Sequence, residues 1–193
     1  MKRAIRLTAF IAATACALAL HAQTYPNRAI RLVVPFPPGG SSDSVARVVV
    51  QKFSEGLGQP VVIENRPGVG GLLGSEAVAK AAPDGYTLLL GSVSSLAVAP
   101  HMFANPKIDP EKNFAAIAPI LSSPLTVIAR PTLPANSIAD LIALAKSKPG
   151  ALNYGTAGVG THVYLTAELF RKLAGFDAVH VPFQGGAPAM AAL

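Results

Sequence analysis

Short apolar runs alternate with amphipathic stretches along the chain from residue 29 onward. The runs are rich in Val, Ile and Leu and are bounded by Gly and Pro, which predicts strands over residues 30–35, 61–64, 86–90, 152–155 and 178–182. Apolar residues at helical spacing predict helices between and after them, over residues 45–56, 72–81, 92–103, 138–148, 161–173 and 187–193. Strands that alternate with helices are typical of an α/β fold with parallel strands.

The stretch over residues 114–131 differs because it is extended and interrupted by prolines, and its best candidate strand is 126–129. We interpret it as a crossing between two lobes, with residues 23–124 in lobe 1 and residues 125–193 in lobe 2. The final predicted helix has neither a capping glycine nor a polar tail, so lobe 2 is interpreted as incomplete. A terminus with a docked final helix is the alternative.

The first 22 residues have the pattern of a secretory signal peptide. Lys2, Arg3 and Arg6 precede an uncharged, alanine-rich apolar run over residues 7–20, which ends near His21 and Ala22. We therefore predict export and cleavage after Ala22. The run is shorter than the roughly 20 apolar residues of a membrane span, although a retained single-pass anchor is the alternative.

Cleavage would change the chemistry of the mature chain. Cys16 is the only cysteine, so its loss with the signal excludes disulfides, cysteine nucleophiles and thiolate metal sites, while a lipid anchor on Cys16 would have a poor sequence context. Residues 1–22 hold three of the sixteen Lys and Arg and none of the ten Asp and Glu, so cleavage lowers the formal charge from +6 to +3. The remaining basic residues are scattered singly, which argues against a nucleic-acid-binding surface.

A glycine-rich loop over residues 35–43 joins a predicted strand to a predicted helix and is a candidate anion site. Its central residues are Gly39, Gly40, Ser41, Ser42 and Asp43. Glycines let a ligand approach the backbone, and a helix N-terminus carries free N–H groups and about half a positive charge. Any of the three polar residues could equally be an N-cap. Since a carboxylate would repel an anion, we expect Asp43 to cap the helix or hold the loop.

A second loop of this kind, over residues 155–162, would lie in the other lobe. Its candidate site residues are Thr156, Gly160, Thr161 and His162. Two such loops that face each other would surround a carboxylate with backbone donors and would need no arginine. The histidine could donate to the ligand or only line the surface at the helix start. A weaker loop of similar chemistry adds Ser92 and Ser94.

The remaining motifs do not predict an enzyme. In the glycine-rich segment 68–74, position six of the dinucleotide fingerprint is Leu73, and no acidic residue ends a strand about 20 residues on. We interpret this segment as a turn that brings a helix close to the sheet, with a dinucleotide-binding enzyme as the alternative. Walker A, nucleophile-elbow and HExxH patterns do not occur. The histidines lack acidic or cysteine partners at metal spacing, so no metal site is predicted.

Several motifs occur together and in order along the mature chain. They are Tyr25-Pro26, residues 30–40 (IRLVVPFPPGG), Asp43, Ala46-Arg47, residues 64–71 (ENRPGVGG), residues 83–88 (PDGYTL), the loop 155–161 and residues 181–185 (VPFQG). On these residues the chain resembles the Bug family, the substrate-binding receptors of tripartite tricarboxylate transporters. The resemblance implies a two-lobed fold similar to that of a type II periplasmic binding protein, a Venus flytrap, whose second lobe is incomplete in this chain.

The resemblance also implies a function. Such receptors close around small carboxylates, often dicarboxylates, through backbone amides, hydroxyls and bridging waters, and present them to the membrane components of a transporter. We therefore expect a monomeric periplasmic receptor with no cofactor and no catalysis, and a ligand-sensing protein that docks on a membrane kinase is the alternative. The family pattern points to these ligand-site residues: Phe36, Gly39, Gly40, Ser41, Ser42, Asp43, Ser92, Ser94, Thr156, Gly160 and Thr161.

The chain departs from the family pattern at two places. Tyr164 stands where the family usually has a histidine, and His162 lies two positions earlier, so hydrogen bonding is expected to differ there. Family members also continue further, completing lobe 2 and crossing back to lobe 1. Without that return we expect exposed apolar sheet surface and unpaired strand edges, which favour aggregation.

Overall fold

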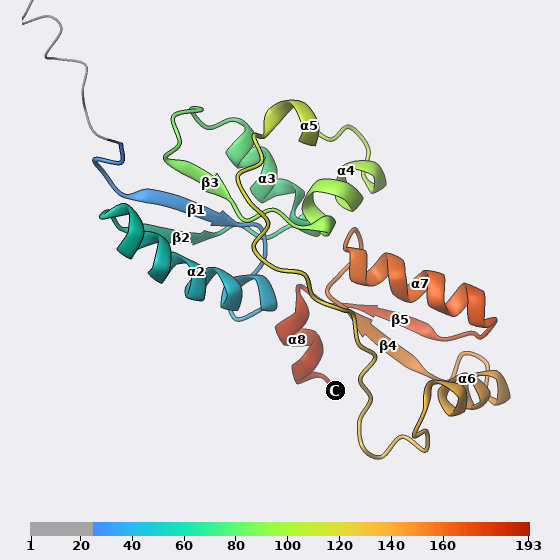
Figure 1. Cartoon of the computed structure of the whole chain (residues 1–193). Helices are drawn as coiled ribbons and strands as arrows, with labels where there is room; N and C mark the ends of the chain where they lie inside the picture. Colours follow the sequence, from blue (N-terminus) through green and yellow to red (C-terminus); the bar gives the residue numbers. More distant parts are fainter. Residues whose placement is uncertain (1–24) are drawn as a thin grey trace, which may run out of the picture.

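The computed structural model describes residues 25–193, and the predicted signal peptide lies outside the described residues (Figure 1). Two separate parallel sheets form the framework, one of three strands and one of two. The strands are β1 (Ile30–Val34), β2 (Val61–Asn65), β3 (Thr87–Leu89), β4 (Asn153–Thr156) and β5 (Val179–Pro182). The helices are α2 (Ser41–Leu57), α3 (Leu72–Ala79), α4 (Ala99–Met102), α5 (Pro110–Asn113), α6 (Ile138–Ser147), α7 (His162–Ala174) and α8 (Gly186–Ala191). The two sheets correspond to the two lobes of the predicted α/β fold.

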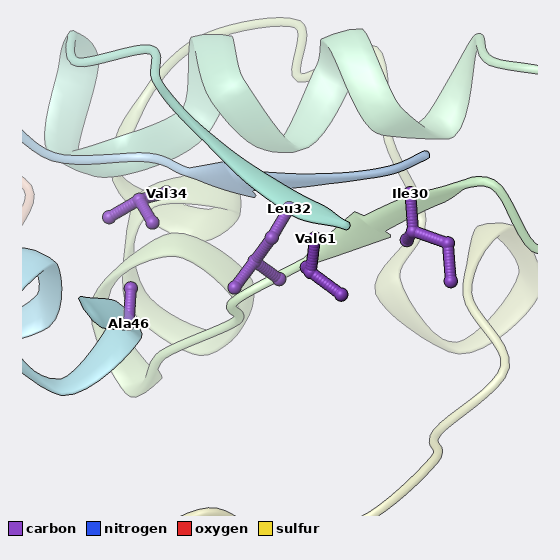
Figure 2. Close-up of a cluster of buried hydrophobic side chains, with 5 residues drawn as sticks. All are labelled: Ile30, Leu32, Val34, Ala46 and Val61. Carbon is purple, nitrogen blue, oxygen red and sulfur yellow. The ribbon is translucent and has the colours of Figure 1, made fainter. Parts of the chain in front are cut away.

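The three-stranded sheet has the order β2-β1-β3, and its core lies against α2. Alternate residues of a strand point to one face, so Ile30, Leu32 and Val34 of β1 share the face that packs on α2. Figure 2 shows these side chains together with Val61 of β2 and Ala46 of α2. All five are buried, which fixes α2 and therefore the position of the loop that precedes it.

The other face of this sheet packs on α3, which begins after a short 3₁₀ turn, η1 (Val69–Gly71). A Cβ atom on Gly74 would lie only 2.8 Å from the Cβ of Pro35 and from the carbonyl oxygen of Arg66. The absence of a side chain at Gly74 thus lets the helix approach the sheet closely. The prediction that segment 68–74 brings a helix close to the sheet is confirmed.

Replacing Gly74 with alanine is expected to lower the free energy of unfolding by about 1–3 kcal/mol, because the added methyl group would overpack this contact. Gly56 in α2 is the control, since a Cβ there meets no atom within 4 Å. Gly56→Ala should stabilise the protein by about 0.5–1 kcal/mol. Urea denaturation measures both changes, and equal behaviour of the two variants would contradict the tight packing of α3.

The second lobe contains the β4–β5 pair, covered by α7. Side chains cap two helices of this lobe: the hydroxyl of Ser137 accepts from the Asp140 N–H at the start of α6, and that of Thr161 accepts from the Tyr164 N–H at the start of α7. Gly175 ends α7 in the left-handed conformation. Figure 1 shows one long extended segment running from α5 in the first lobe past β4 to α6.

Three details differ from the sequence-based expectations. The predicted strand over residues 126–129 is wrong, because this exposed segment pairs with no strand among the described residues, and a strand requires a hydrogen-bonding neighbour. The short helix α5 was not predicted, although Asp109 caps it and Pro110 occupies its first turn. The helix predicted over residues 92–103 is divided into a π-helical turn, η2 (Val93–Val98), and α4.

Across residues 25–193, none of the helices has the length and apolar character needed to cross a bilayer.

Candidate functional site

A cleft of about 250 Å³ lies between the two sheets. Its walls are the loops that follow the carboxyl ends of β1, β2, β4 and β5, which is where ligands bind in open α/β sheets. The lining residues are Phe36, Pro37, Pro67, Gly68, Val69, Gly70, Gly71, Ala157, Gly158, Val159, Thr161, Pro182, Phe183, Gln184 and Gly185. None of these described residues has a charged side chain, so the cleft offers backbone groups, a hydroxyl, an amide and apolar surface.

Asp43 organises the loop between β1 and α2. Its side chain is 1% exposed, and its Oδ2 atom accepts from the Gly39 N–H at 2.9 Å and from Arg47 Nε at 2.8 Å. Asn65, at the end of β2, donates from Nδ2 to Asp43 Oδ1 and to the Phe36 carbonyl oxygen, both at 3.0 Å. The carboxylate is therefore engaged by protein donors, as expected for a residue that holds the loop.

These hydrogen bonds also set the ionisation of Asp43. The Gly39 N–H, followed by the hydrogen bond from Arg47, lowers the pKa of Asp43 to about 2 against the opposing effect of burial. Asp43 is thus ionised at neutral pH. Asn65 was not singled out from the sequence, because an asparagine at a strand end carries no signal for the loop that it supports.

Two serine hydroxyls at the start of α2 take no part in the hydrogen bonds around Asp43. Gly40 is the N-cap residue of α2, and no side chain caps this helix. The N-cap is therefore not Ser41, Ser42 or Asp43. Within the described part of the chain, the hydroxyls of Ser41 and Ser42 have no hydrogen-bond partner. Neither serine lines the cleft, whereas Phe36 does.

In the second loop, the hydroxyls of two buried threonines shape the backbone. Thr156 Oγ1 lies 2.8 Å from His180 Nε2 and accepts from the Gly158 N–H at 3.2 Å. Thr161 Oγ1 donates to the Gly158 carbonyl oxygen at 2.6 Å and caps α7. Both side chains are 2% exposed. Backbone atoms at Gly158 and Thr161 therefore line the cleft in a fixed geometry, and Thr161 brings the N-terminus of α7 to it.

The serine-rich turn η2 contacts the second lobe. Ser92 caps it, since its Oγ atom accepts from the Ser95 N–H at 3.2 Å. Ser94 Oγ lies 2.7 Å from His162 Nδ1 and accepts from the His162 N–H at 3.0 Å. Burial lowers the pKa of His162, which favours the neutral ring. Ser94 and His162 were both predicted as ligand-site residues, and the structure brings them into contact with each other.

The loop over residues 68–71 was not predicted to belong to the site, yet it lines the cleft. Val69, Gly70 and Gly71 all have positive φ, at 52°, 65° and 95°. A β-branched residue rarely adopts this conformation. The loop also touches the second lobe, because a Cβ atom on Gly70 would lie 2.5 Å from the carbonyl oxygen of Gly160. Gly160 itself packs against the ring of Phe103.

The chain therefore brings together loops from both lobes around an uncharged cleft. Of the predicted residues, Phe36 and Thr161 line it directly. Asp43, Ser92 and Thr156 support the surrounding loops, and Ser94 and His162 join the lobes. Ser41 and Ser42 have neither role among the described residues. The sequence pattern identified the loops but could not separate hydroxyls that cap helices from hydroxyls that face a ligand. Among residues 25–193, His, Asp and Glu side chains form no group of three that could hold a metal ion.

Known proteins resemble this chain in both sequence and fold. A UPF0065 protein of Bordetella pertussis is 44% identical over 191 residues, which are 98% of this chain and 58% of that protein. The structure of MatC from Rhodopseudomonas palustris with bound malate superposes with a TM-score of 0.80 at 36% identity, covering 88% of this chain and 57% of MatC. Rpa4515 of R. palustris with adipate gives a TM-score of 0.77 at 35% identity, with coverage of 88% and 57%.

This chain spans a little under three fifths of the length of these relatives. The matched structures confirm the predicted two-lobed α/β fold, and this chain covers part of it. The family model for receptors of the tripartite tricarboxylate transporter family matches residues 45–193. The chain thus belongs to the tripartite tricarboxylate transporter receptor family, TctC, as the sequence motifs indicated.

Proposed function

We propose that this protein is a periplasmic solute receptor that binds a small organic anion, a carboxylate or dicarboxylate, in the cleft between its lobes. It would present this ligand to the membrane components of a tripartite tricarboxylate-type transporter without transforming it. Residues 1–22 would direct export, and residues 23–124 and 125–193 would contribute to the two lobes. The observation that carries the proposal is the cleft itself, where glycine-rich loops of both lobes converge outside the strand ends.

The chemistry of the cleft supports an anionic ligand. The glycine-rich loops present main-chain groups to the cleft, and the N-terminus of α7 adds a partial positive charge beside Thr161. Without a charged side chain in the described lining, a carboxylate would be held by neutral donors, and exchange would remain fast enough for delivery. Two relatives have been solved with malate and with adipate, and both of these ligands are dicarboxylates.

Thermal unfolding of the purified chain with a panel of mono-, di- and tricarboxylates tests the proposal. A ligand that binds only the native state at about 100 times its Kd adds about 2.7 kcal/mol of stability. For a chain of this size the midpoint should rise by about 5–11 °C. The diamide of the best dicarboxylate is the control and should give no rise, because it lacks the charge. A cooperative transition that no carboxylate moves would overturn the proposal.

A further inference from the structure

We propose that Ser94 and His162 form a pH-sensitive clasp between the lobes, which protonation of the His162 imidazole opens. Ser94 lies in η2 of the first lobe, and His162 is the first residue of α7 in the second. Two hydrogen bonds join them, one to the ring at 2.7 Å and one from the main chain at 3.0 Å. Ser94 is 2% exposed, so water does not readily replace these bonds.

The direction of the two bonds makes the contact sensitive to the protonation state. The His162 N–H can only donate, so Ser94 Oγ accepts from it. The Ser94 hydroxyl proton is then available for His162 Nδ1, which must carry no proton to accept it. Among the described residues the buried Ser94 hydroxyl has no other acceptor, so its proton is satisfied only when the ring is neutral and carries its proton on Nε2. An imidazolium has protons on both nitrogens, and the buried Ser94 hydroxyl would lose its acceptor.

The surroundings of His162 provide no compensation for a positive charge. The turn η2 contains no titratable side chain, and the macrodipole at the start of α7 is itself positive. On α4, His101 is exposed. Other titratable groups of α7 and β4 have other partners: the Tyr164 ring packs against His180 at a tilt, and Glu168 accepts from Arg171 and Tyr154. Burial is thus the effect that lowers the pKa of His162.

The sign of the pH dependence follows. When the lobes separate, the ring becomes hydrated and its pKa returns toward the ordinary value of about 6.5. The closed form therefore binds protons less readily than the open form. The clasp is fully effective above about pH 6.5 and weakens as the pH falls below this value. The ratio of closed to open protein then decreases by at most about tenfold for each pH unit.

The clasp would regulate ligand binding, and this step rests on the proposed function. Residues 157–159 and Thr161 lie just before His162 and line the cleft together with residues 36–37 and 67–71 of the first lobe. Opening the clasp would move these two walls apart and weaken the grip on a ligand. Acidification would then favour release.

An NMR titration of the histidine side chains, combined with small-angle X-ray scattering at pH 8 and pH 5, tests the clasp without any ligand. We expect His162 to titrate below its ordinary range with the neutral proton on Nε2, and the radius of gyration to increase at pH 5. In Ser94→Ala, the pKa of His162 should rise toward about 6.5, and the protein should be open at both pH values.

Two further variants separate a clasp from a merely structural contact. His162→Asn keeps an acceptor near the position of Nδ1 but cannot be protonated, so it should stay closed at pH 8 and at pH 5. His101→Asn removes an exposed histidine and should retain the pH response of the unchanged protein. A radius of gyration that does not change with pH in the unchanged protein, or an unaltered pKa of His162 in Ser94→Ala, would overturn the inference. Since no ligand is present, either result is independent of whether carboxylates bind.

Discussion

Replacing Asp43 with alanine is expected to lower the free energy of unfolding by about 3 kcal/mol, one of the largest effects of any single substitution in this chain. The substitution removes the acceptor of the Gly39 N–H and breaks the pairs with Arg47 and Asn65. It also removes the support of the loop that carries Phe36 at the cleft. Urea denaturation at pH 7 measures the loss.

Asp109 provides a matched control because it also stands at a helix start. It caps the short helix α5, but its side chain is 44% exposed, and its partners are local. Asp109→Ala should therefore lower the free energy of unfolding clearly less than Asp43→Ala does. If Asp43→Ala is no more harmful than Asp109→Ala, the buried network does not hold the loop between β1 and α2.

The acid range gives an independent measure of the same network. The pKa of Asp43 is lowered to about 2 in the folded protein, against about 3.9 in an unfolded chain. The group therefore contributes stability that is present above about pH 4 and is lost as the pH falls toward about 2. Asp43→Ala should lack this part of the acid dependence. A variant that loses stability over the same pH interval as the unchanged protein would show that other carboxylates are responsible.

Local signals explain why most elements of the fold could be predicted. The apolar run of β1 is almost completely buried, and a buried strand carries a near-continuous apolar pattern. The caps at Ser137 and Thr161 depend on residues three positions apart, which a sequence displays directly. The strand expected over residues 126–129 has the same local pattern but no neighbour among the described residues. Local composition cannot supply a pairing partner, so this prediction was wrong.

The site was less predictable because its contacts are not local. The pairing of Ser94 with His162 joins residues 68 positions apart, and the role of Asn65 depends on a loop 22 positions earlier in the chain. The hydroxyls of Thr156 and Thr161 looked available for a ligand, yet both are engaged within their own loop. The loop around Gly70 was rejected as a dinucleotide fingerprint, and only the fold reveals that it faces the other lobe.

Replacing Gly70 with alanine should abolish the stabilisation by a carboxylate while costing the unliganded protein only about 1–2 kcal/mol. The cost arises because Gly70 has a φ of 65°, which is unfavourable for any residue with a Cβ atom. The new methyl group would also lie 2.5 Å from the Gly160 carbonyl oxygen of the other lobe. Because Gly70 and Gly160 lie in different lobes, the lobes would relieve this clash by moving apart, and a closed ligand site could not form.

Gly58→Ala is the control that isolates the clash. Gly58 ends α2 with a φ of 66°, almost the same as that of Gly70, but a Cβ atom there meets no atom within 4 Å. Both variants should therefore lose similar stability, measured by thermal unfolding without ligand. With the best carboxylate of the panel, the midpoint of Gly58→Ala should rise as in the unchanged protein, whereas that of Gly70→Ala should not move. An equal rise in the two variants would mean that ligand binding does not require residues 68–71 and the loop containing Gly160 to approach each other.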